Sequence, residues 1–305
     1  MADFRRFLDP RVLNRLARLE LKARYLVEGF IAGMHRSPYR GVSVDFAQHR
    51  EYVPGDDVRF VDWKVFAKSD RFYIKEFEEE TNLTCHLFVD ASESMAYGST
   101  QDGETITKWS YATWVAAGLA HLLLRQRDAV GVALYRDGVE RMVPSSNGRG
   151  QLQTICEVLE AVQPGGQTAI ATAVEQMADR ATKRGIAVLV SDFFEDVPRI
   201  LRAIEQLRYR GHEVILFHVL DRDEVEFPFE RMTRFEGLEE LPKLLVDPKA
   251  IREAYLAEFG QHREELRKAC ATNQVDLVHA QTDSTLDKCL VAYLGKRASR
   301  LRAKR

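Results

Sequence analysis

Beyond residue 85, short apolar segments of strand length alternate with longer amphipathic segments of helix length, and this alternation limits the possible folds most strongly. Continuously apolar strands are buried on both faces of a sheet, and helices between them form the crossover connections of parallel strands. The sequence therefore predicts an α/β fold, with a doubly wound, mostly parallel sheet that carries helices on both faces.

The boundaries of these elements follow from the apolar runs and from turn residues. We expect an antiparallel hairpin around Asp137-Gly138, because this dipeptide between two short strands is a strong turn signal. We expect strands at residues 87–89, 130–134, 139–143, 186–190, 214–219 and 275–278, and helices at about residues 107–125, 149–162, 169–184, 197–210, 248–273 and 284–297.

The pattern changes near residue 85, which suggests more than one structural part. Asp9-Pro10 predicts the start of a first helix, and an apolar stripe runs from Val12 to Phe30. Gly29, Gly33 and Ser37-Pro38 suggest where this helix ends. Residues 40–85 instead contain turn signals, strand-like pieces and an acidic run. We therefore expect three parts: an N-terminal helix with an extension over residues 1–84, an α/β domain over residues 85–295, and a basic tail over residues 296–305.

Composition places the chain among ordinary globular proteins. Of its 305 residues, 45% are hydrophobic and 30% are charged, and the formal net charge is −2. This balance excludes a disordered chain and gives no global attraction to nucleic acid. Four scattered cysteines without C-x-x-C spacing are typical of reduced thiols. Because we find neither a membrane-span pattern nor a signal-peptide core, we expect a cytoplasmic protein without a membrane span.

Oxygen-bearing side chains follow two of the predicted strands. The segment Asp90-Ala91-Ser92-Glu93-Ser94 comes directly after residues 87–89, and Asp192 comes shortly after residues 186–190. The carboxyl ends of parallel strands meet at one edge of a sheet, where functional groups gather. Carboxylate and hydroxyl oxygens are hard ligands that suit Mg²⁺ or Mn²⁺. We therefore predict a metal site formed by Asp90, Ser92, Ser94, Asp192 and Thr168, the last of which follows Gly165-Gly166-Gln167.

Each of these residues also has a purely structural interpretation, which the sequence leaves open. Asp90 and Ser92 are residue types that cap helices, and Thr168 stands where it would cap the helix at residues 169–184. Asp192 is also consistent with an ordinary acid in a loop. Capping and metal contact are compatible roles for Thr168.

Two motifs resemble those of known families. D-x-S-x-S, followed by a distant Thr and a distant Asp, resembles the metal-ion-dependent adhesion site (MIDAS) of von Willebrand factor A (VWA) domains. The block R-E-Y-V-P-G-D-D-V-R-F-V-D-W at residues 50–63, with F-E-E-E at residues 77–80, resembles the bacterial DUF58 family. The resemblance implies a VWA-like domain over residues 85–295, preceded by a DUF58-specific extension.

The resemblance also implies a function for the predicted site. Ser92 and Ser94 match hydroxyls that bind the metal directly, whereas Asp90, Thr168 and Asp192 match groups that bind it directly or through water. A carboxylate from a partner protein completes the metal shell in such domains. The chain is therefore expected to be a metal-dependent protein-interaction module and not an enzyme. The family further implies an adaptor or chaperone-like partner of a MoxR-type AAA+ ATPase, acting on a client protein.

Two stretches need separate interpretation. Many VWA domains have Asp-Gly where this chain has Asp192-Phe193-Phe194, and we expect the apolar pair to narrow the mouth of the site.

Within the upstream block, Asp56 and Asp57 fit a turn and a helix cap, and Trp63 fits packing. The alternative for this block is a family-specific surface that positions the N-terminal segment against the metal domain.

Other classes of function have less support. The sequence contains no G-x-x-x-x-G-K-[ST], H-E-x-x-H or G-x-S-x-G motif. A metal-assisted hydrolase is the alternative function, because hydrated Mg²⁺ with two carboxylates promotes phosphoryl chemistry. Arginines in residues 297–305 offer phosphate contacts, but the near-neutral total charge argues against nucleic acid as a partner. We expect His86 and His218 to occupy core or edge positions in apolar strands.

Overall fold

The computed structural model describes residues 44–53, 61–79, 83–101, 103–178, 184–235, 244–286 and 288–290. The chain divides into a smaller unit, Ile31–Asn82, and a larger one that contains Met1–Phe30 and Leu83–Arg305. The predicted first helix, Asp56 and Asp57, and the basic tail at residues 296–305 lie outside the described residues. The domain boundaries predicted from the sequence remain predictions.

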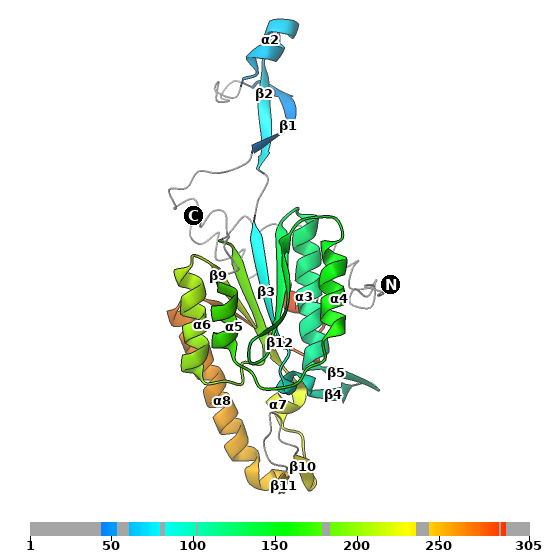
Figure 1. The fold of residues 1–305 in the computed structure, drawn as a ribbon, viewed down its shortest axis with the longest axis vertical. Coiled ribbons are helices and arrows are strands. Elements are labelled where there is room, and N and C mark those ends of the chain that lie inside the picture. The colour runs from blue at the N-terminus through cyan, green and yellow to red at the C-terminus, as the bar shows by residue number, and fades with distance from the viewer. Residues whose placement is uncertain are drawn as a thin grey trace. The chain divides into compact units, whose positions relative to one another are not determined.

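The smaller unit is a two-stranded antiparallel sheet with one short helix. Strands β1 (Val44–Glu51) and β2 (Tyr73–Glu79) pair with one register shift, and helix α2 (Trp63–Ser69) lies at one end of the hairpin (Figure 1). Asp62 caps this helix, because its side chain accepts hydrogen bonds from the backbone amides of Lys64 and Val65. No side chain within α2 is buried.

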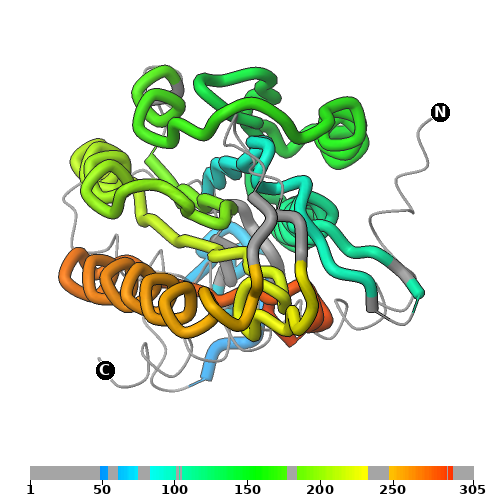
Figure 2. Tube along the Cα trace, turned by 90° about the horizontal axis from the view of Figure 1, so that it is seen from below, coloured from blue at the N-terminus to red at the C-terminus, as the bar shows by residue number. Residues whose placement is uncertain are grey.

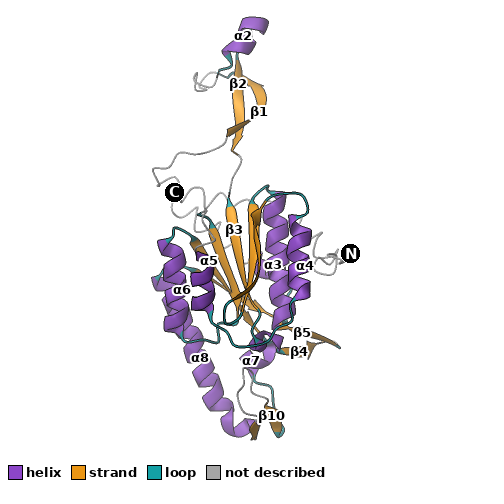
Figure 3. Ribbon diagram, viewed as in Figure 1, coloured by secondary structure: helices purple, strands orange, loops and turns teal. Residues whose placement is uncertain are grey.

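The larger unit is built on a six-stranded sheet with the order β12-β9-β8-β3-β6-β7. All neighbouring strands are parallel except β7, which is antiparallel to β6. Figure 3 shows the strands in orange and the helices in purple. The predicted mostly parallel sheet is thus confirmed, and so is the hairpin at Asp137-Gly138. The strands are β3 (Thr84–Asp90), β6 (Ala129–Tyr135), β7 (Val139–Ser146), β8 (Ile186–Ser191), β9 (Glu213–Leu220) and β12 (Asp276–Gln281).

Helices cover both faces of this sheet, as predicted (Figure 2). Alternate strand residues such as Phe88, Leu189 and Leu216 share a buried cluster with residues of α5, α6 and α8, so these three helices cover one face. Helix α3 contributes nothing to that cluster but contacts β3, β6, β8 and β9, so it covers the other face. The helices are α3 (Lys108–Arg125), α4 (Gln151–Ala161), α5 (Ile170–Ala178), α6 (Val197–Tyr209) and α8 (Pro248–Thr272).

Several small elements were not predicted from the sequence, and some of them lie next to the candidate site. The 3₁₀ turn η3 (Glu93–Ala96) follows β3, and the hairpin of β4 (Gly98–Gln101) and β5 (Glu104–Thr107) precedes α3. The short helix α7 (Arg222–Glu226) follows β9, and a small hairpin of β10 (Thr233–Phe235) and β11 (Leu244–Val246) precedes α8. Within the described residues, no helix combines the length and apolarity needed to cross a bilayer.

Candidate metal site

The sheet topology brings the two predicted strand-end acids to the same edge. Strands β3 and β8 are parallel neighbours, and Val89 pairs with Val190, so their carboxyl ends finish side by side. Asp90 is the last residue of β3, and Asp192 follows the last residue of β8. Both side chains are almost fully buried, with relative exposures of 0% and 1%. The prediction that both acids lie at one sheet edge is therefore confirmed.

Asp90 is the centre of a set of hydrogen bonds from three segments of the chain. Its Oδ1 accepts the backbone amide of Ser92 at 2.8 Å. Its Oδ2 accepts the hydroxyl of Thr168 at 3.0 Å and that of Ser191 at 2.6 Å. Thr168 thus reaches the site across 78 residues of sequence. Ser191 belongs to this cluster as well and was missed by the sequence analysis, although it adjoins Asp192.

The loop that carries Thr168 is fixed against the loop after β3 by the backbone. The amide of Glu93 donates to the carbonyl of Gly166 at 2.9 Å, and the amide of Gly165 donates to the carbonyl of Ala91 at 2.9 Å. Gly166 has a φ of 75°, a conformation that glycine adopts without the steric cost of a Cβ atom. The positive φ of Gly166, rather than a lack of space for a side chain, is therefore what calls for glycine before Thr168.

The two serines of the motif lie together and are buried. Ser92 Oγ and Ser94 Oγ are 3.0 Å apart, and the two residues are 0% and 8% exposed. Ser92 occupies the N-cap position of η3, yet its side chain makes no capping hydrogen bond. The capping interpretation of the Ser92 hydroxyl is therefore not what the structure shows. Asp90 does accept the backbone amide of Ser92, as a capping residue would. It therefore combines a local structural role with its contacts to Thr168 and Ser191.

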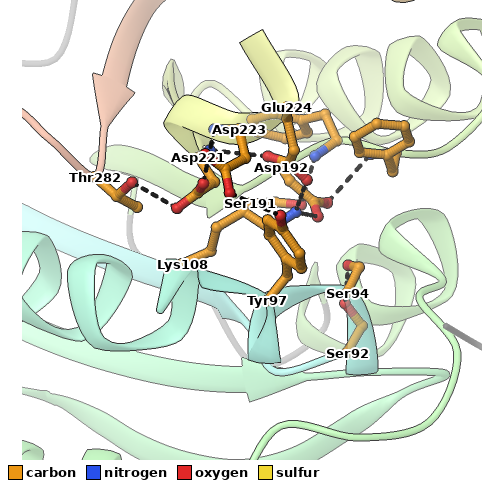
Figure 4. A network of polar contacts seen from close by, with 12 residues as sticks. Ser92, Ser94, Tyr97, Lys108, Ser191, Asp192, Asp221, Asp223, Glu224 and Thr282 are labelled. Carbon is orange, nitrogen blue, oxygen red and sulfur yellow. Dashed lines mark hydrogen bonds and ion pairs between the residues drawn. The ribbon is translucent and has the colours of Figure 1, made fainter. Parts of the chain in front are cut away.

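Asp192 is held by an ion pair that the sequence analysis missed. Its Oδ2 lies 2.7 Å from Nζ of Lys108, and the same ammonium lies 2.5 Å from Oε1 of Glu224 (Figure 4). Lys108 is only 1% exposed although it is the first residue of α3. The sequence places a lysine at the start of a long apolar helix, and Asp221-x-x-Glu224 is a capping-box pattern, but neither feature links the two segments.

The capping box of α7 fixes Glu224 in place. Asp221 Oδ1 accepts the amide of Asp223 at 2.9 Å, and Glu224 Oε2 accepts the amide of Asp221 at 2.8 Å. The other oxygen of the Asp221 carboxylate accepts the amide and hydroxyl of Ser99 at 3.1 Å each and the hydroxyl of Thr282 at 2.8 Å. One oxygen of Glu224 therefore accepts the backbone amide of Asp221 at the start of α7, and the other accepts a hydrogen bond from Lys108.

Burial and charge push the pKa values of the three site acids in different directions. Burial, reinforced by the nearby charge of Asp192, raises the pKa of Asp90 to about 6. Burial acts in the same direction on Asp192, but the Lys108 ammonium and hydrogen bonds outweigh it, so the pKa of Asp192 lies below its usual value. Burial raises the pKa of Glu224, because Lys108 offsets only part of the desolvation. Asp192 is thus the acid that the protein holds most firmly in its ionised form.

The two phenylalanines after Asp192 occupy different environments. Phe193 has a φ of 51° and is 1% exposed, so its side chain belongs to the core. Phe194 is 47% exposed and stacks on His262 with ring centroids 6.1 Å apart. Its ring centroid lies 5.5 Å from Nζ of Lys108. Only Phe194 therefore lies exposed beside the acids. The expectation that both rings narrow the mouth of the site is wrong for Phe193, because its ring packs in the core, and stays a prediction for Phe194.

The donor set of this edge fits a hard dication. Asp90, Ser92, Ser94, Thr168 and Asp192 provide carboxylate and hydroxyl oxygens, which match the ligand preference of Mg²⁺ and Mn²⁺. Over the part of the chain that the structure describes, no group of three or more His, Cys, Asp or Glu side chains could hold a metal ion. A cation at this edge must therefore depend on the hydroxyl groups as much as on the acids.

Sheet order, helices on both faces and the D-x-S-x-S loop at a strand end define a VWA-like α/β protein. The chain belongs to the DUF58 family: the family model described as "Protein of unknown function DUF58" matches residues 48–265.

Comparison with other proteins gives relatives of similar length and distant structures. The chain is 26% identical to "Uncharacterized protein Mb1516" of Mycobacterium bovis and to "Uncharacterized protein Rv1480" of Mycobacterium tuberculosis, over 95% of this chain and 90% of each relative. Similar solved structures include BatB from Bacteroides thetaiotaomicron, with 14% identity, a TM-score of 0.45, and coverage of 71% of this chain and 99% of that one. The SpRpn10 VWA domain has 15% identity, a TM-score of 0.40, and coverage of 68% and 93%.

Proposed function

We propose that this protein is a protein-interaction module that binds a partner through a divalent cation at the edge formed by β3 and β8. The observation that carries the proposal is the cluster at Asp90, where hydroxyls of Thr168 and Ser191 meet one buried carboxylate beside the Ser92–Ser94 pair. A buried group of oxygens from three separate segments is costly to desolvate, and a bound cation offsets that cost.

The proposed ligands are the five residues of the sequence prediction. Ser92 and Ser94 are proposed to bind the cation directly, and Asp90, Thr168 and Asp192 to bind it directly or through water. The ion, Mg²⁺ or Mn²⁺, supplies a coordination position for an acid of the partner protein. The protein's own residues would hold the ion at the ends of β3 and β8. Because these side chains are buried, they would also limit the access of water to it.

The proposal extends to the kind of partner. We propose an adaptor or chaperone-like role beside a MoxR-type AAA+ ATPase. Such a role needs a docking site and no catalytic residue, and we propose none for this chain. In this role a cation held by these residues would provide a coordination position for a carboxylate of the ATPase or of its client. The proposed location of this pairing is the cytoplasm.

Calorimetric titration with Mg²⁺ and with Mn²⁺ tests the metal site. The wild-type protein is expected to bind one ion, and the Ser92→Ala/Ser94→Ala variant to lose at least about tenfold in affinity, because two hydroxyl ligands are removed. Ser69→Ala, an exposed serine in α2, is the matched control and is expected to behave as the wild type. Equal affinity in the wild type and the double variant contradicts the proposed ligands.

Co-purification tests the bridging role. A MoxR-type ATPase expressed with this protein is expected to co-purify in Mg²⁺ and to be released by a chelator. Asp192→Ala is expected to weaken the association in the same way. An association that is insensitive to both changes contradicts metal bridging and leaves the ion, if bound, with another role.

A further inference from the structure

A buried lysine lies among the acids of the proposed site, and its charge has consequences for any ion bound there. Lys108 Nζ contacts Asp192 at 2.7 Å and Glu224 at 2.5 Å, and the lysine side chain is 1% exposed. A lysine is rarely buried this completely, and the two carboxylates offset its desolvation. The ammonium is therefore a fixed positive charge next to a proposed metal ligand.

The two carboxylate oxygens of Asp192 accept hydrogen bonds from different donors of the protein. One oxygen accepts Lys108, and the other accepts the amide of Phe194 at 3.3 Å. The Ser94 hydroxyl also contributes to lowering the pKa of this acid. Any cation that uses Asp192 must share it with the ammonium, and like charges at short range repel each other.

We infer that Lys108 tunes the proposed site, weakening its hold on the dication while preserving the affinity of the bound ion for an incoming carboxylate. This inference rests on the proposed function. Lys108 acts through Asp192 and through its charge, and we assign it no direct bond to the ion.

Charge counting explains why one residue has both effects. Asp90, Asp192 and Glu224 carry three formal negative charges, and Lys108 reduces the total to two. A dication then neutralises the cluster, so that a partner's acid meets no net negative charge. Without Lys108, the same ion leaves one uncompensated negative charge, which repels a carboxylate.

Glu224 provides an opposing test of the same idea. Its capping box keeps one oxygen directed at Lys108, so the ammonium is divided between Glu224 and Asp192. Neutralising Glu224 removes a negative charge near the ion. It also leaves Asp192 as the carboxylate that pairs with the Lys108 ammonium. Both consequences weaken binding of a cation, whereas removing Lys108 strengthens it.

The experiment is calorimetric titration of the full chain with Mn²⁺ at pH 8, which lies above the value of about 6 to which the pKa of Asp90 is raised. Lys108→Met is expected to bind Mn²⁺ at least about tenfold more tightly than the wild type, and Glu224→Gln at least about threefold more weakly. Lys108→Arg keeps the charge and is expected to resemble the wild type. Acetate, titrated onto the Mn²⁺-loaded proteins, is expected to bind Lys108→Met more weakly than the wild type.

The opposite signs separate tuning from a merely structural role. If Lys108 only holds the fold together, Lys108→Met and Glu224→Gln both bind Mn²⁺ more weakly, and this result overturns the inference, as do unchanged affinities. If Lys108→Met does not fold, Glu224→Gln decides: tighter or unchanged binding overturns the inference. Absence of Mn²⁺ binding by the wild type overturns the proposed metal site itself, and the tuning with it.

Discussion

At the scale of single residues, Asp90 is an acid whose environment differs clearly between the folded and the unfolded chain. It is fully buried, and its pKa is raised from 3.8 to about 6. The folded state therefore binds the proton of Asp90 more tightly than the unfolded state does. The stability that this proton provides is fully present below about pH 4 and is lost as the pH rises through about 6.

This difference predicts a pH dependence of the free energy of unfolding. Between about pH 3 and pH 7, the wild type is expected to lose roughly 3 kcal/mol relative to Asp90→Asn, because the variant carries no titrating group at this position. Urea unfolding of both proteins at several pH values measures the difference. Parallel pH profiles for the two proteins are incompatible with a raised pKa at Asp90.

The same acid predicts how a dication affects stability. Above pH 6 the ionised Asp90 is available to a cation, whereas at pH 5 a proton competes for it. Excess Mg²⁺ is therefore expected to raise the Tm at pH 7.5 by several degrees and to raise it less at pH 5. Thermal unfolding with Mg²⁺ and with a chelator measures both shifts, and an equal shift at both pH values contradicts Asp90 as a ligand.

At the scale of elements, the short helix α7 depends on one buried carboxylate. Asp221 is 0% exposed and accepts hydrogen bonds from Ser99, Thr282 and Asp223, so it joins α7 to β4 and to the end of β12. The same residue starts the capping box that orients Glu224. A change at Asp221 therefore affects both local stability and the ion pair of Lys108.

Asp221→Ala is expected to lower the free energy of unfolding by about 3 kcal/mol, because several buried donors lose their acceptor. Asp247→Ala is the matched control, since Asp247 caps α8 from an exposed position and its loss costs about 1 kcal/mol. Urea unfolding compares the two variants. Equal losses would show that the buried network at Asp221 adds nothing beyond an ordinary helix cap.

The short helix of the smaller unit depends on its capping residue. Asp62 caps α2, and its Oδ2 lies 2.9 Å from Nε2 of His49. No side chain within α2 is buried. Because α2 has only seven residues, the cap supplies much of its stability. Asp62→Ala is expected to speed hydrogen exchange in α2 and leave exchange in the sheet of the larger unit unchanged. Ser69→Ala serves as the control, and unaltered exchange in α2 would contradict the role of the cap.

At the scale of the whole molecule, periodicity in the sequence predicted the sheet and its main helices. Continuously apolar strands and amphipathic helices are recognisable because each segment carries its own pattern of buried residues. The six strands of the main sheet and the helices α3, α4, α5, α6 and α8 appear close to the expected ranges. The convergence of Asp90 and Asp192 followed from the rule for parallel strand ends. Thr168 also reaches Asp90, as expected for a residue of the same site.

The parts that sequence reasoning missed depend on contacts between distant segments. Lys108 resembles an ordinary first-turn lysine, and only the fold brings it to Asp192, 84 residues away. The hairpin of β4 and β5 consists of short polar strands without the apolar alternation that identifies a strand. Long-range polar pairing leaves no periodic pattern in a sequence, so it becomes visible only in three dimensions.

Anomalous diffraction from crystals grown in excess Mn²⁺ tests the central claim most directly. We expect one strong peak at the edge formed by β3 and β8, within ligand distance of the hydroxyls of Ser92 and Ser94, with Lys108 still paired to Glu224. A crystal soaked to saturation with Mn²⁺ that shows no peak there, or shows Mn²⁺ only on exposed acids such as Glu226 and Asp247, would contradict the account.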